Sequence, residues 1–383
     1  MLESRDHLRW PADVYIEGGD QFRGWFNSSL MVGLAVHDRA PYDAVLTHGW
    51  TLDAQGKAMH KSLGNAVSPE EVIPKLGAEV LRLWCVSSDY MEDMRCSDEI
   101  LQRVTDGYRK LRNTARFALG NLDGFDPCRD SVREEEMLEI DRWALAELDS
   151  AIADVRAAYE AYDFHLVYQR LHQFCTVTLS ARYFDIIKDR LYTFAPCNPA
   201  RRSAQTALYK IADALARMLA PILVFTADEI WENLPQDSET ALTSVHVAVL
   251  PETRGVDDTE LLNAWAHLFG YRDAVLARLE EARIAKVIGS SLEARIEISA
   301  GSHAYKNLSR HRDDLRYVFI VSQVELLEPN AEIDEDGLNV TVTRAHGEKC
   351  ERCWNYSTRV GESSRYPTVC ERCVVALKEI EGI

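Results

Sequence analysis

The sequence predicts a multidomain protein in which an α/β part precedes an all-α part, followed by a small α+β segment and a metal-binding knuckle. Three observations lead to this expectation. Strand and helix patterns alternate over residues 1–96, long amphipathic helical patterns fill residues 97–250, and two Cys-x-x-Cys pairs lie near the end of the chain. Such changes of pattern along 383 residues are typical of separate domains with separate cores.

Residues 1–96 are expected to form part of a parallel α/β sheet. Asp13-Val-Tyr-Ile-Glu17 alternates apolar and polar side chains, as a strand does. Gly18-Gly19 ends this strand, and a helical pattern follows over residues 21–36. The first element pair is therefore a strand followed by a helix.

A second strand is predicted over residues 43–47 and is expected to continue over residues 48–53 to a turn at residues 54–56. Ser68-Pro-Glu-Glu71 is a capping box with proline at the first helical position, so a helix is predicted to begin there. The resulting strand–helix–strand–helix order is typical of a parallel sheet.

Residues 97–250 are predicted to form an antiparallel helical bundle, because long amphipathic patterns are joined by short loops. The helix boundaries are predicted from loop signals at residues 123–127, 195–199 and 234–238 and from capping boxes at residues 131–134 and 226–229. Five aromatic residues are interpreted as core: Tyr162, Tyr168, Phe174, Tyr183 and Phe184.

The segment 251–344 is predicted to be α+β. A pattern rich in alanine, leucine and charge predicts a helix over residues 258–285. Three strand-like runs follow, at residues 292–298, 317–328 and 338–344. This segment is expected to connect the helical bundle to the cysteine-rich end.

Residues 345–383 are expected to form a zinc knuckle. Cys350 and Cys353 make one Cys-x-x-Cys pair, and Cys370 and Cys373 make a second. This spacing is that of a closed tetrahedral Cys₄ site, which is structural because no position is left for water. The alternative is four ordinary buried or disulfide-bonded cysteines. The remaining cysteines are interpreted as small core residues: Cys85, Cys96, Cys128, Cys175 and Cys197.

The net charge of −18 requires any nucleic-acid contact to use local basic patches. Arg109, Arg112 and Arg116 recur at helical spacing, so they share one helix face. A solvated surface is the alternative interpretation of this face, and the same holds for Arg201-Arg202. No run approaches eighteen apolar residues, so no membrane span and a cytoplasmic location are expected.

Four stretches together resemble the bacterial isoleucyl-tRNA synthetase family. They are residues 11–26 (with Glu17-Gly-Gly-Asp20-Gln21), residues 57–65, the run Tyr108-Arg-Lys-Leu-Arg-Asn-Thr, and the paired Cys-Glu-Arg-Cys motifs with Trp354. The resemblance covers the whole chain. It implies the second half of a Rossmann-like catalytic domain over residues 1–96, an anticodon-binding domain over 97–250, a junction segment over 251–344 and the zinc knuckle over 345–383.

The resemblance also implies a phosphate-closing loop. The family's Lys-Met-Ser-Lys-Ser corresponds here to Ala58-Met59-His60-Lys61-Ser62, which we call the closing loop. A lysine on such a loop can neutralise the charge that grows on the triphosphate of ATP, bound with Mg²⁺, as an adenylate forms. Lys61 is accordingly the predicted catalytic residue. Ala58 and His60 depart from the family pattern, which puts a clamp of two lysines in doubt.

By the same resemblance, Glu17 lies against the isoleucyl-adenylate, and Asp20 and Gln21 are candidates for ribose or amino-group contacts. Residue by residue, an ordinary strand-end carboxylate is the alternative for Glu17, and a helix N-cap is the alternative for Asp20. Arg109, Arg112 and Arg116 are expected to position tRNA phosphates. Arg352, Arg359, Arg365 and Arg372, beside Trp354 and Tyr356, suggest a further nucleic-acid surface on the knuckle.

The expected partners are isoleucine, ATP, tRNA(Ile) and an amino-terminal half that carries a His-x-Gly-His signature, supplied in cis or in trans. The isolated chain is expected to be inactive without that half. Three alternatives remain open: a non-catalytic tRNA-binding remnant, a valine or leucine member of the same family, and a DNA-reading zinc module.

Overall fold

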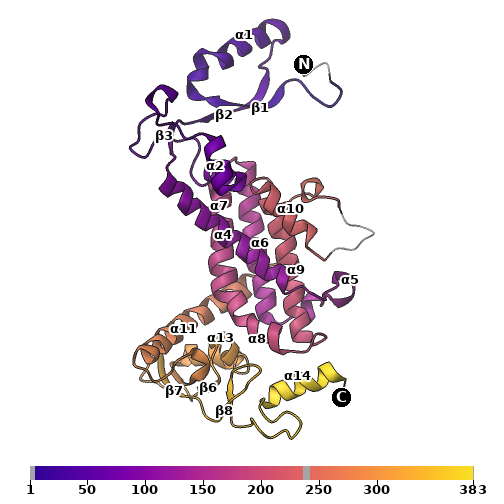
Figure 1. Cartoon of the computed structure of the whole chain (residues 1–383), viewed down its shortest axis with the longest axis vertical. Coiled ribbons are helices and arrows are strands. Elements are labelled where there is room, and N and C mark those ends of the chain that lie inside the picture. Colours follow the sequence, from indigo (N-terminus) through magenta and orange to yellow (C-terminus); the bar gives the residue numbers. More distant parts are fainter. Residues whose placement is uncertain (1–4, 236–241, 383) are drawn as a thin grey trace. The chain divides into compact units, whose positions relative to one another are not determined.

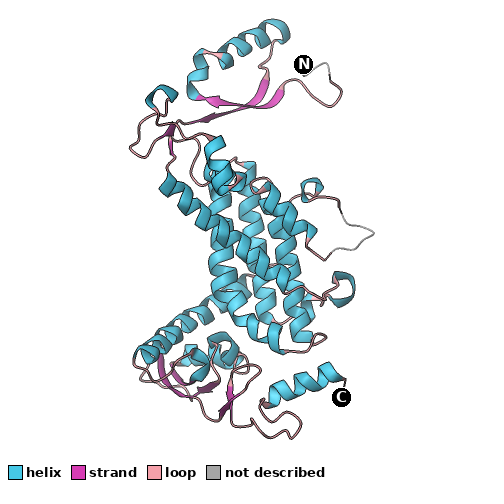
Figure 2. Cartoon of the chain, viewed as in Figure 1, coloured by secondary structure: helices cyan, strands magenta, loops and turns pink. Residues whose placement is uncertain are grey.

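The computed structural model describes residues 5–235 and 242–382, with the side chain of Lys61 outside that description. The chain divides into two compact units. Figure 1 shows the helices and strands of the chain, coloured along the sequence. The first comprises residues 1–112, 154–172 and 219–226, and the second comprises residues 113–153, 173–218 and 227–383. Helices dominate and the strands are short, as Figure 2 shows.

The first unit begins with a parallel strand pair. β1 (Ala12–Gly18) pairs with β2 (Tyr42–His48) in a register that runs from Ala12 opposite Tyr42 to Gly18 opposite His48. α1 (Trp25–His37) connects them. Both strands are confirmed. The helix predicted from residue 21 begins later, because a 3₁₀ turn over Gly19–Arg23 and the non-helical Gly24 precede it.

The predicted continuation of the second strand through residues 48–53 is wrong. The chain turns at Gly49, where an added Cβ would lie 2.3 Å from the Glu92 backbone. β3 (Thr51–Leu52) instead pairs in parallel with β4 (Met94–Arg95). The close approach of two backbones thus interrupts a run that is locally strand-like.

α2 (Pro69–Leu76) begins where the capping box predicted, because the Ser68 hydroxyl accepts a hydrogen bond of 3.3 Å from the Glu70 amide. α3 (Ala78–Val86) follows. Within the same unit, Arg82 donates to the carbonyls of Ile222 at 2.7 Å and Pro221 at 2.9 Å. α3 therefore holds the connection that leads into the last helix of the bundle.

The predicted capping box at residues 226–229 is wrong. α10 (Val224–Glu232) begins two residues earlier, so Thr226 lies inside the helix. The buried carboxylate of Glu79 accepts from the Phe225 and Thr226 amides at 3.3 and 3.4 Å. A remote carboxylate thereby binds the free amides of this helix start.

The all-α part consists of long helices with short connections. They are α4 (Asp98–Gly120), α6 (Glu139–Glu160), α7 (Phe164–Gln173), a π-helical segment (Phe174–Phe184), α8 (Asp185–Thr193), α9 (Pro199–Leu219) and α10. Phe174, Tyr183 and Phe184 are buried as predicted, whereas Tyr162 and Tyr168 are only half-buried.

The capping box at residues 131–134 is also wrong. Residues Glu134–Glu136 form one 3₁₀ turn, and the Ser131 hydroxyl donates to the Pro127 carbonyl at 2.5 Å. Pro127 opens the short helix α5 (Pro127–Asp130) at the end of the predicted loop 123–127. Of the predicted loop 234–238, residues 236–238 lie outside the described residues.

A buried ionic network ties the bundle together within the second unit. Asp141 is fully buried and accepts from the Tyr183 hydroxyl at 2.7 Å and from Nη1 of Arg190 at 3.0 Å. The Ser203 hydroxyl also donates to Asp141. Burial and the neighbouring Asp141 carboxylate raise the pKa of Tyr183 well above its ordinary value, so its phenol donates in the neutral form.

The α+β segment begins with α11 (Thr259–Ile284), which confirms the predicted helix. Its three-stranded sheet has the order β6-β5-β7, with β5 (Ala294–Ala300) central. β6 (Gln323–Leu326) is parallel to β5, and β7 (Leu338–Arg344) is antiparallel to it. α12 (Ser302–Arg310) follows β5.

The strand predicted over residues 317–328 is only partly present. Its first residues belong to the helix α13 (Leu315–Phe319), and Ile320 then adopts a left-handed conformation with φ of 56°. Val318 and Phe319 are thus buried on a helical turn rather than on a strand. Such short apolar runs do not distinguish a buried helix from a strand.

The knuckle contains a small hairpin, β8 (Glu348–Lys349) with β9 (Tyr356–Ser357), and the helix α14 (Glu371–Glu381). Of the other cysteines, Cys96 and Cys175 are buried as predicted. That interpretation is wrong for Cys85, Cys128 and Cys197, which are exposed. Over the described ranges, no helix is both long and apolar enough to cross a membrane.

Candidate functional sites

The carboxyl ends of β1 and β2 bring Glu17 and His48 together. Nε2 of His48 lies 3.8 Å from Oε2 of Glu17, and the Gly18 amide donates to the same oxygen at 3.2 Å. Both side chains are roughly half exposed, 50% for Glu17 and 41% for His48. Ligands of open parallel sheets bind at this edge, so Glu17 occupies a position that can meet one.

Gly18 allows the next side chains to crowd this edge. A Cβ at Gly18 would lie 2.8 Å from Oδ1 of Asp20, 3.8 Å from Cε1 of His48 and 3.9 Å from the Trp50 ring. Asp20 lies in the 3₁₀ turn and accepts from Nε2 of Gln21 at 3.4 Å. The structure therefore gathers Glu17, Asp20, His48 and Trp50 around one glycine.

Gln21 also has a structural role. Its Oε1 accepts from the Trp25 amide at 3.0 Å, which satisfies a free N–H at the start of α1. The sequence does not reveal this cap, because the capping side chain comes four residues before the amide it binds. The side-chain amide nitrogen of Gln21 donates to Asp20 and is not used in this cap.

Sequence reasoning also missed His48 and Trp50, which it treated as strand residues. Trp50 is 57% exposed although it is a large aromatic residue. Its amide donates to Oδ1 of Asp93 at 2.7 Å, which fixes the backbone at this point. A His-Gly-Trp sequence at the carboxyl end of a predicted strand is a signal that could have indicated a ligand-binding edge.

The closing loop, residues 58–62, follows β3 and a tight turn. Asp53 accepts from the Lys57 amide just before the loop, and Asn65 binds Asp53, the Ala58 carbonyl and the His60 amide. Met59 is half-buried against the cluster of Val72, Cys96 and Leu101. The catalytic candidate Lys61 begins the 3₁₀ turn Lys61–Leu63, and its side chain lies outside the described part. Ser62 is exposed.

One face of α4 carries the three predicted arginines. Arg109, Arg112 and Arg116 are exposed, whereas Leu111 and Ala115 on the opposite face are buried. Arg109 is paired with Asp106 at 3.4 Å, and Arg112 donates to the Tyr108 hydroxyl at 3.4 Å. These contacts are long and exposed, so an external anion can compete with them.

Arg201 and Arg202 bind the protein itself. Arg201 donates to the Phe194 carbonyl at 3.2 Å, and Arg202 is paired with the half-buried Asp130 at 3.1 Å. Together with Arg129, this environment lowers the pKa of Asp130 to about 2. These contacts argue against the open phosphate site that the sequence suggested for the pair.

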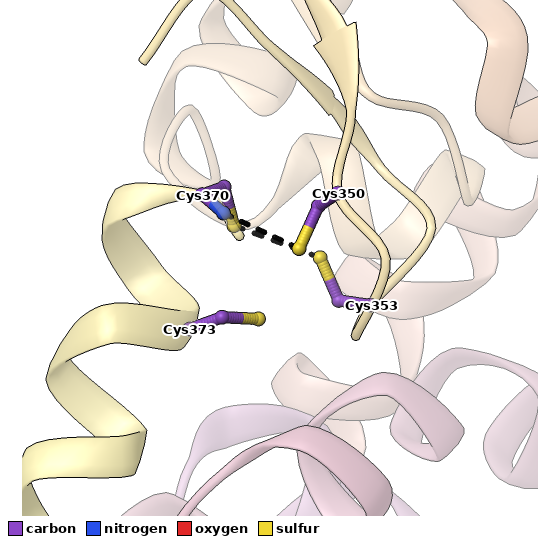
Figure 3. A group of neighbouring side chains, drawn as sticks. All are labelled: Cys350, Cys353, Cys370 and Cys373. Atoms are coloured by element: carbon purple, nitrogen blue, oxygen red, sulfur yellow. Dashed lines mark hydrogen bonds between the residues drawn. The ribbon is translucent and has the colours of Figure 1, made fainter. Parts of the chain in front are cut away.

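The four cysteines of the knuckle converge (Figure 3). Their sulfur atoms all lie within 4.8 Å of one another, and all four residues are buried. The Cys353 and Cys370 sulfurs are 3.7 Å apart, far beyond a disulfide bond of about 2.05 Å. Sulfurs that each bind Zn²⁺ at about 2.3 Å in a tetrahedron lie about 3.8 Å apart. The donor set therefore fits zinc.

The crowding of the sulfurs also favours a cation between them. A hydrogen bond from the Cys370 thiol lowers the pKa of Cys353, and the resulting thiolate raises the pKa of Cys370 to about 11. It raises that of Cys373 as well. Four thiolates at these distances require a bound positive charge, which a divalent metal supplies.

Arg352 and Arg372 do not lie on an open nucleic-acid surface, which corrects the sequence-based suggestion. Arg372 forms a bidentate pair with Asp189 of α8, with Nη2 3.0 Å from Oδ1. Arg352 donates to the Thr193 carbonyl at the end of α8 and to the Cys373 sulfur at 3.6 Å. Each arginine directly neighbours a cysteine of the cluster, so together they dock the knuckle onto α8.

Two other predicted cations of the knuckle are paired internally. Arg359 is paired with Glu362 at 2.9 Å, and Arg365 is paired with Glu381. Trp354 remains 62% exposed and has a positive φ of 64°. The ammonium of Lys349 lies 5.5 Å from the centre of its ring.

Comparisons with known proteins agree with this architecture. Three family models match: "tRNA synthetases class I (I, L, M and V)" over residues 2–97, "Anticodon-binding domain of tRNA ligase" over 141–298, and "Zinc finger found in FPG and IleRS" over 347–375.

Solved structures with a similar fold include a LeuRS of Agrobacterium radiobacter K84, solved with tRNA and LeuAMS. It has a TM-score of 0.51 at 20% identity, and the match covers 66% of this chain and 29% of that chain. Methionyl-tRNA synthetase of Mycobacterium tuberculosis, solved with methionyl-adenylate, has a TM-score of 0.50 at 21% identity, covering 64% of this chain and 48% of its own. The fold and the matched domains are those of class I aminoacyl-tRNA synthetases.

Curated relatives indicate which family within this class the chain resembles. Isoleucine–tRNA ligase of Syntrophotalea carbinolica is 49% identical over 99% of this chain, and that of Moorella thermoacetica is 47% identical over 99%. The chain belongs to the isoleucine–tRNA ligase family. It spans about two fifths of these relatives, 41% and 42% of their lengths respectively.

Proposed function

We propose that this chain supplies part of an isoleucine–tRNA ligase, which activates isoleucine with ATP and transfers it to tRNA(Ile). The observation that carries the proposal is the 49% identity to an isoleucine–tRNA ligase over 99% of the chain. The chain matches only 41% of that relative, so an amino-terminal half completes the proposed enzyme, in cis or in trans. The proposed location is the cytoplasm.

The proposed catalytic contribution combines the sheet edge with the closing loop. Glu17, with Asp20 and Gln21, contacts polar groups of the isoleucyl-adenylate. Lys61 stabilises the negative charge that grows on the α-phosphate and pyrophosphate of ATP, while Mg²⁺ bound to ATP shares that charge. Since this charge is greatest in the transition state, Lys61 acts on the rate rather than on isoleucine binding.

The rest of the chain is proposed to bind tRNA and one structural Zn²⁺. The exposed arginines of α4 contact phosphates, which positions the anticodon for base recognition by other residues. Cys350, Cys353, Cys370 and Cys373 hold the zinc, and the metal completes the core of the knuckle. A match limited to the zinc finger would also fit a DNA-binding module, but the match to an anticodon-binding domain favours tRNA.

The proposal is tested by ATP–pyrophosphate exchange driven by isoleucine. The chain is assayed alone and together with the amino-terminal part of the Syntrophotalea carbinolica relative. We expect exchange only from the combination, and only with isoleucine among isoleucine, valine and leucine. A zinc-loaded combination that binds tRNA(Ile) but gives no exchange would instead support the non-catalytic remnant.

Replacing Lys61 with alanine should slow pyrophosphate exchange about 10²- to 10³-fold in the reconstituted enzyme. The KM for isoleucine should change little, because the lost contact forms mainly in the transition state. Lys57→Ala, four residues earlier at an exposed position, is the matched control and should cost much less. Equal losses in rate and in isoleucine binding would contradict the role of Lys61.

Replacing Arg109, Arg112 and Arg116 together with alanine should weaken binding of tRNA(Ile) and make it less dependent on salt. Loss of three contacts to single-stranded phosphates lowers the slope of log K against log[salt] by about 2. Filter binding between 50 and 200 mM KCl measures this slope. A triple variant of exposed arginines elsewhere, Arg133, Arg278 and Arg283, is the control. An unchanged slope would refute the proposed interface.

A further inference from the structure

We propose that Asp53 and Asn65 are positioning residues that hold the closing loop, and we call their contact the Asp53–Asn65 clasp. The inference deepens the proposed function and rests on it, because the role of the loop in ATP chemistry belongs to that proposal. Neither residue lies within the five loop positions themselves. Each binds the loop or its entry from outside.

Asp53 organises the entry to the loop. Its Oδ1 accepts from the Gln55 amide at 3.0 Å and from the Lys57 amide at 2.9 Å. Its own amide donates to the Lys57 carbonyl at 2.8 Å, and Gly56 turns the chain with φ of 80°. The hydrogen bond from Asn65, together with these backbone bonds, lowers the pKa of Asp53, so the carboxylate is the accepting form.

Asn65 joins that entry to the loop. Its Nδ2 donates to Oδ2 of Asp53 at 2.8 Å and to the Ala58 carbonyl at 3.2 Å. Its Oδ1 accepts from the His60 amide at 3.0 Å. A single side chain therefore binds the carboxylate before the loop, the first loop residue and the residue that directly precedes Lys61.

An asparagine suits this position because it donates and accepts at once. Aspartate at residue 65 would offer no donor and would face the Asp53 carboxylate at hydrogen-bond distance. Fixing loop residues costs conformational entropy, which the hydrogen bonds of the clasp offset before substrate arrives. Loss of the clasp should therefore affect the rate of adenylate formation more than the binding of isoleucine.

The first experiment measures hydrogen–deuterium exchange in the chain alone, in peptides that cover residues 57–61. Asn65→Ala should speed exchange in these peptides about three- to tenfold, the effect of losing one or two hydrogen bonds. Gln55→Ala is the matched control, because it keeps the backbone amide that Asp53 binds, and it should exchange as the unaltered chain does. Unchanged exchange in Asn65→Ala would overturn the clasp.

The second experiment exchanges the two side chains. Asn65→Asp alone should speed exchange more than Asn65→Ala, because two carboxylates then repel each other. The double variant D53N/N65D restores an amide opposite a carboxylate and should recover most of the protection. If the double variant is no better protected than Asn65→Asp, the pairing of residues 53 and 65 is wrong.

Pyrophosphate exchange with the added amino-terminal part then tests the positioning role. We expect kcat to fall about tenfold or more in Asn65→Asp and to rise again in D53N/N65D, while the KM for isoleucine stays the same. A kcat that does not follow hydrogen exchange across these variants overturns the positioning role. Absence of pyrophosphate exchange from the unaltered chain combined with the amino-terminal part counts against the proposed function. Unaltered hydrogen-exchange protection in the variants counts against the clasp.

Discussion

Replacing Cys353 with serine is expected to release the metal and unfold the zinc knuckle, residues 345–383, while the bundle keeps its helices. The buried cluster of the knuckle consists of the four cysteines and Val369, with only half-buried apolar residues around it. Without the metal, that core is therefore a group of thiols. Zinc binding in such small domains contributes about 10–16 kcal/mol, which is folding free energy.

Metal analysis and hydrogen exchange measure this outcome. Zinc should fall from one per chain to none, and α14 should lose its protection from exchange. Cys85→Ser, an exposed cysteine outside the cluster, is the control and should change neither. A knuckle that stays ordered after chelation, with α14 still protected, would show that its fold does not depend on zinc.

Loss of the knuckle should extend to the end of α8. Arg372 and Arg352 reach Asp189 and the Thr193 carbonyl from positions next to the zinc ligands. When the ligands separate, these arginines lose their fixed backbone, so the last turn of α8 should exchange faster. The zinc site therefore organises part of the bundle as well as its own segment.

Features encoded over short stretches could be predicted from the sequence. The strands β1 and β2, the helix α11 and the start of α2 at Ser68 follow from alternation, helical periodicity and one capping residue. The convergence of the cysteines likewise follows from two tight pairs. In each case the residues that determine the structure lie within one element or one turn.

Features that depend on distant residues could not be predicted. Glu79 caps α10 from 146 residues away, and Arg372 finds Asp189 across 183 residues. A basic residue beside an aromatic one suggests nucleic acid, but here Arg372 lies over the Phe194 and Tyr317 rings inside the protein. Whether such a cation binds an external phosphate or an internal carboxylate depends on the fold, because the partner residue is distant in the sequence.

The candidate site likewise contains some residues that the sequence identifies and others that only the fold brings together. Glu17 and the closing loop are recognisable as motifs, whereas His48 and Trp50 reach the same edge only because β2 pairs with β1 in this register. The Asp53–Asn65 contact spans twelve residues and closes around a turn. Its individual residues are common in loops, so their sequence carries no signal of the pairing.

Replacing Asp141 with asparagine is expected to destabilise the helical bundle by about 3–5 kcal/mol. Asp141 is fully buried, and Arg190 is only 7% exposed. The variant keeps the shape of the side chain but leaves the Arg190 guanidinium without its countercharge in a place that water scarcely reaches. Tyr183 and Ser203 also donate to Asp141, so the loss of charge weakens three hydrogen-bonding partners at once.

Urea unfolding followed by helical circular dichroism measures this loss. Asp154→Asn is the matched control, because Asp154 also pairs with an arginine, Arg170, but its side chain is 57% exposed. Exposed ion pairs contribute about 0–1 kcal/mol, so the control should unfold nearly as the unaltered chain does. The double variant D141L/R190M removes both charges and should recover much of the stability, since the cost arises from an unpaired charge rather than from a missing bond. A double variant as unstable as Asp141→Asn would show instead that the bundle requires the ionic network itself.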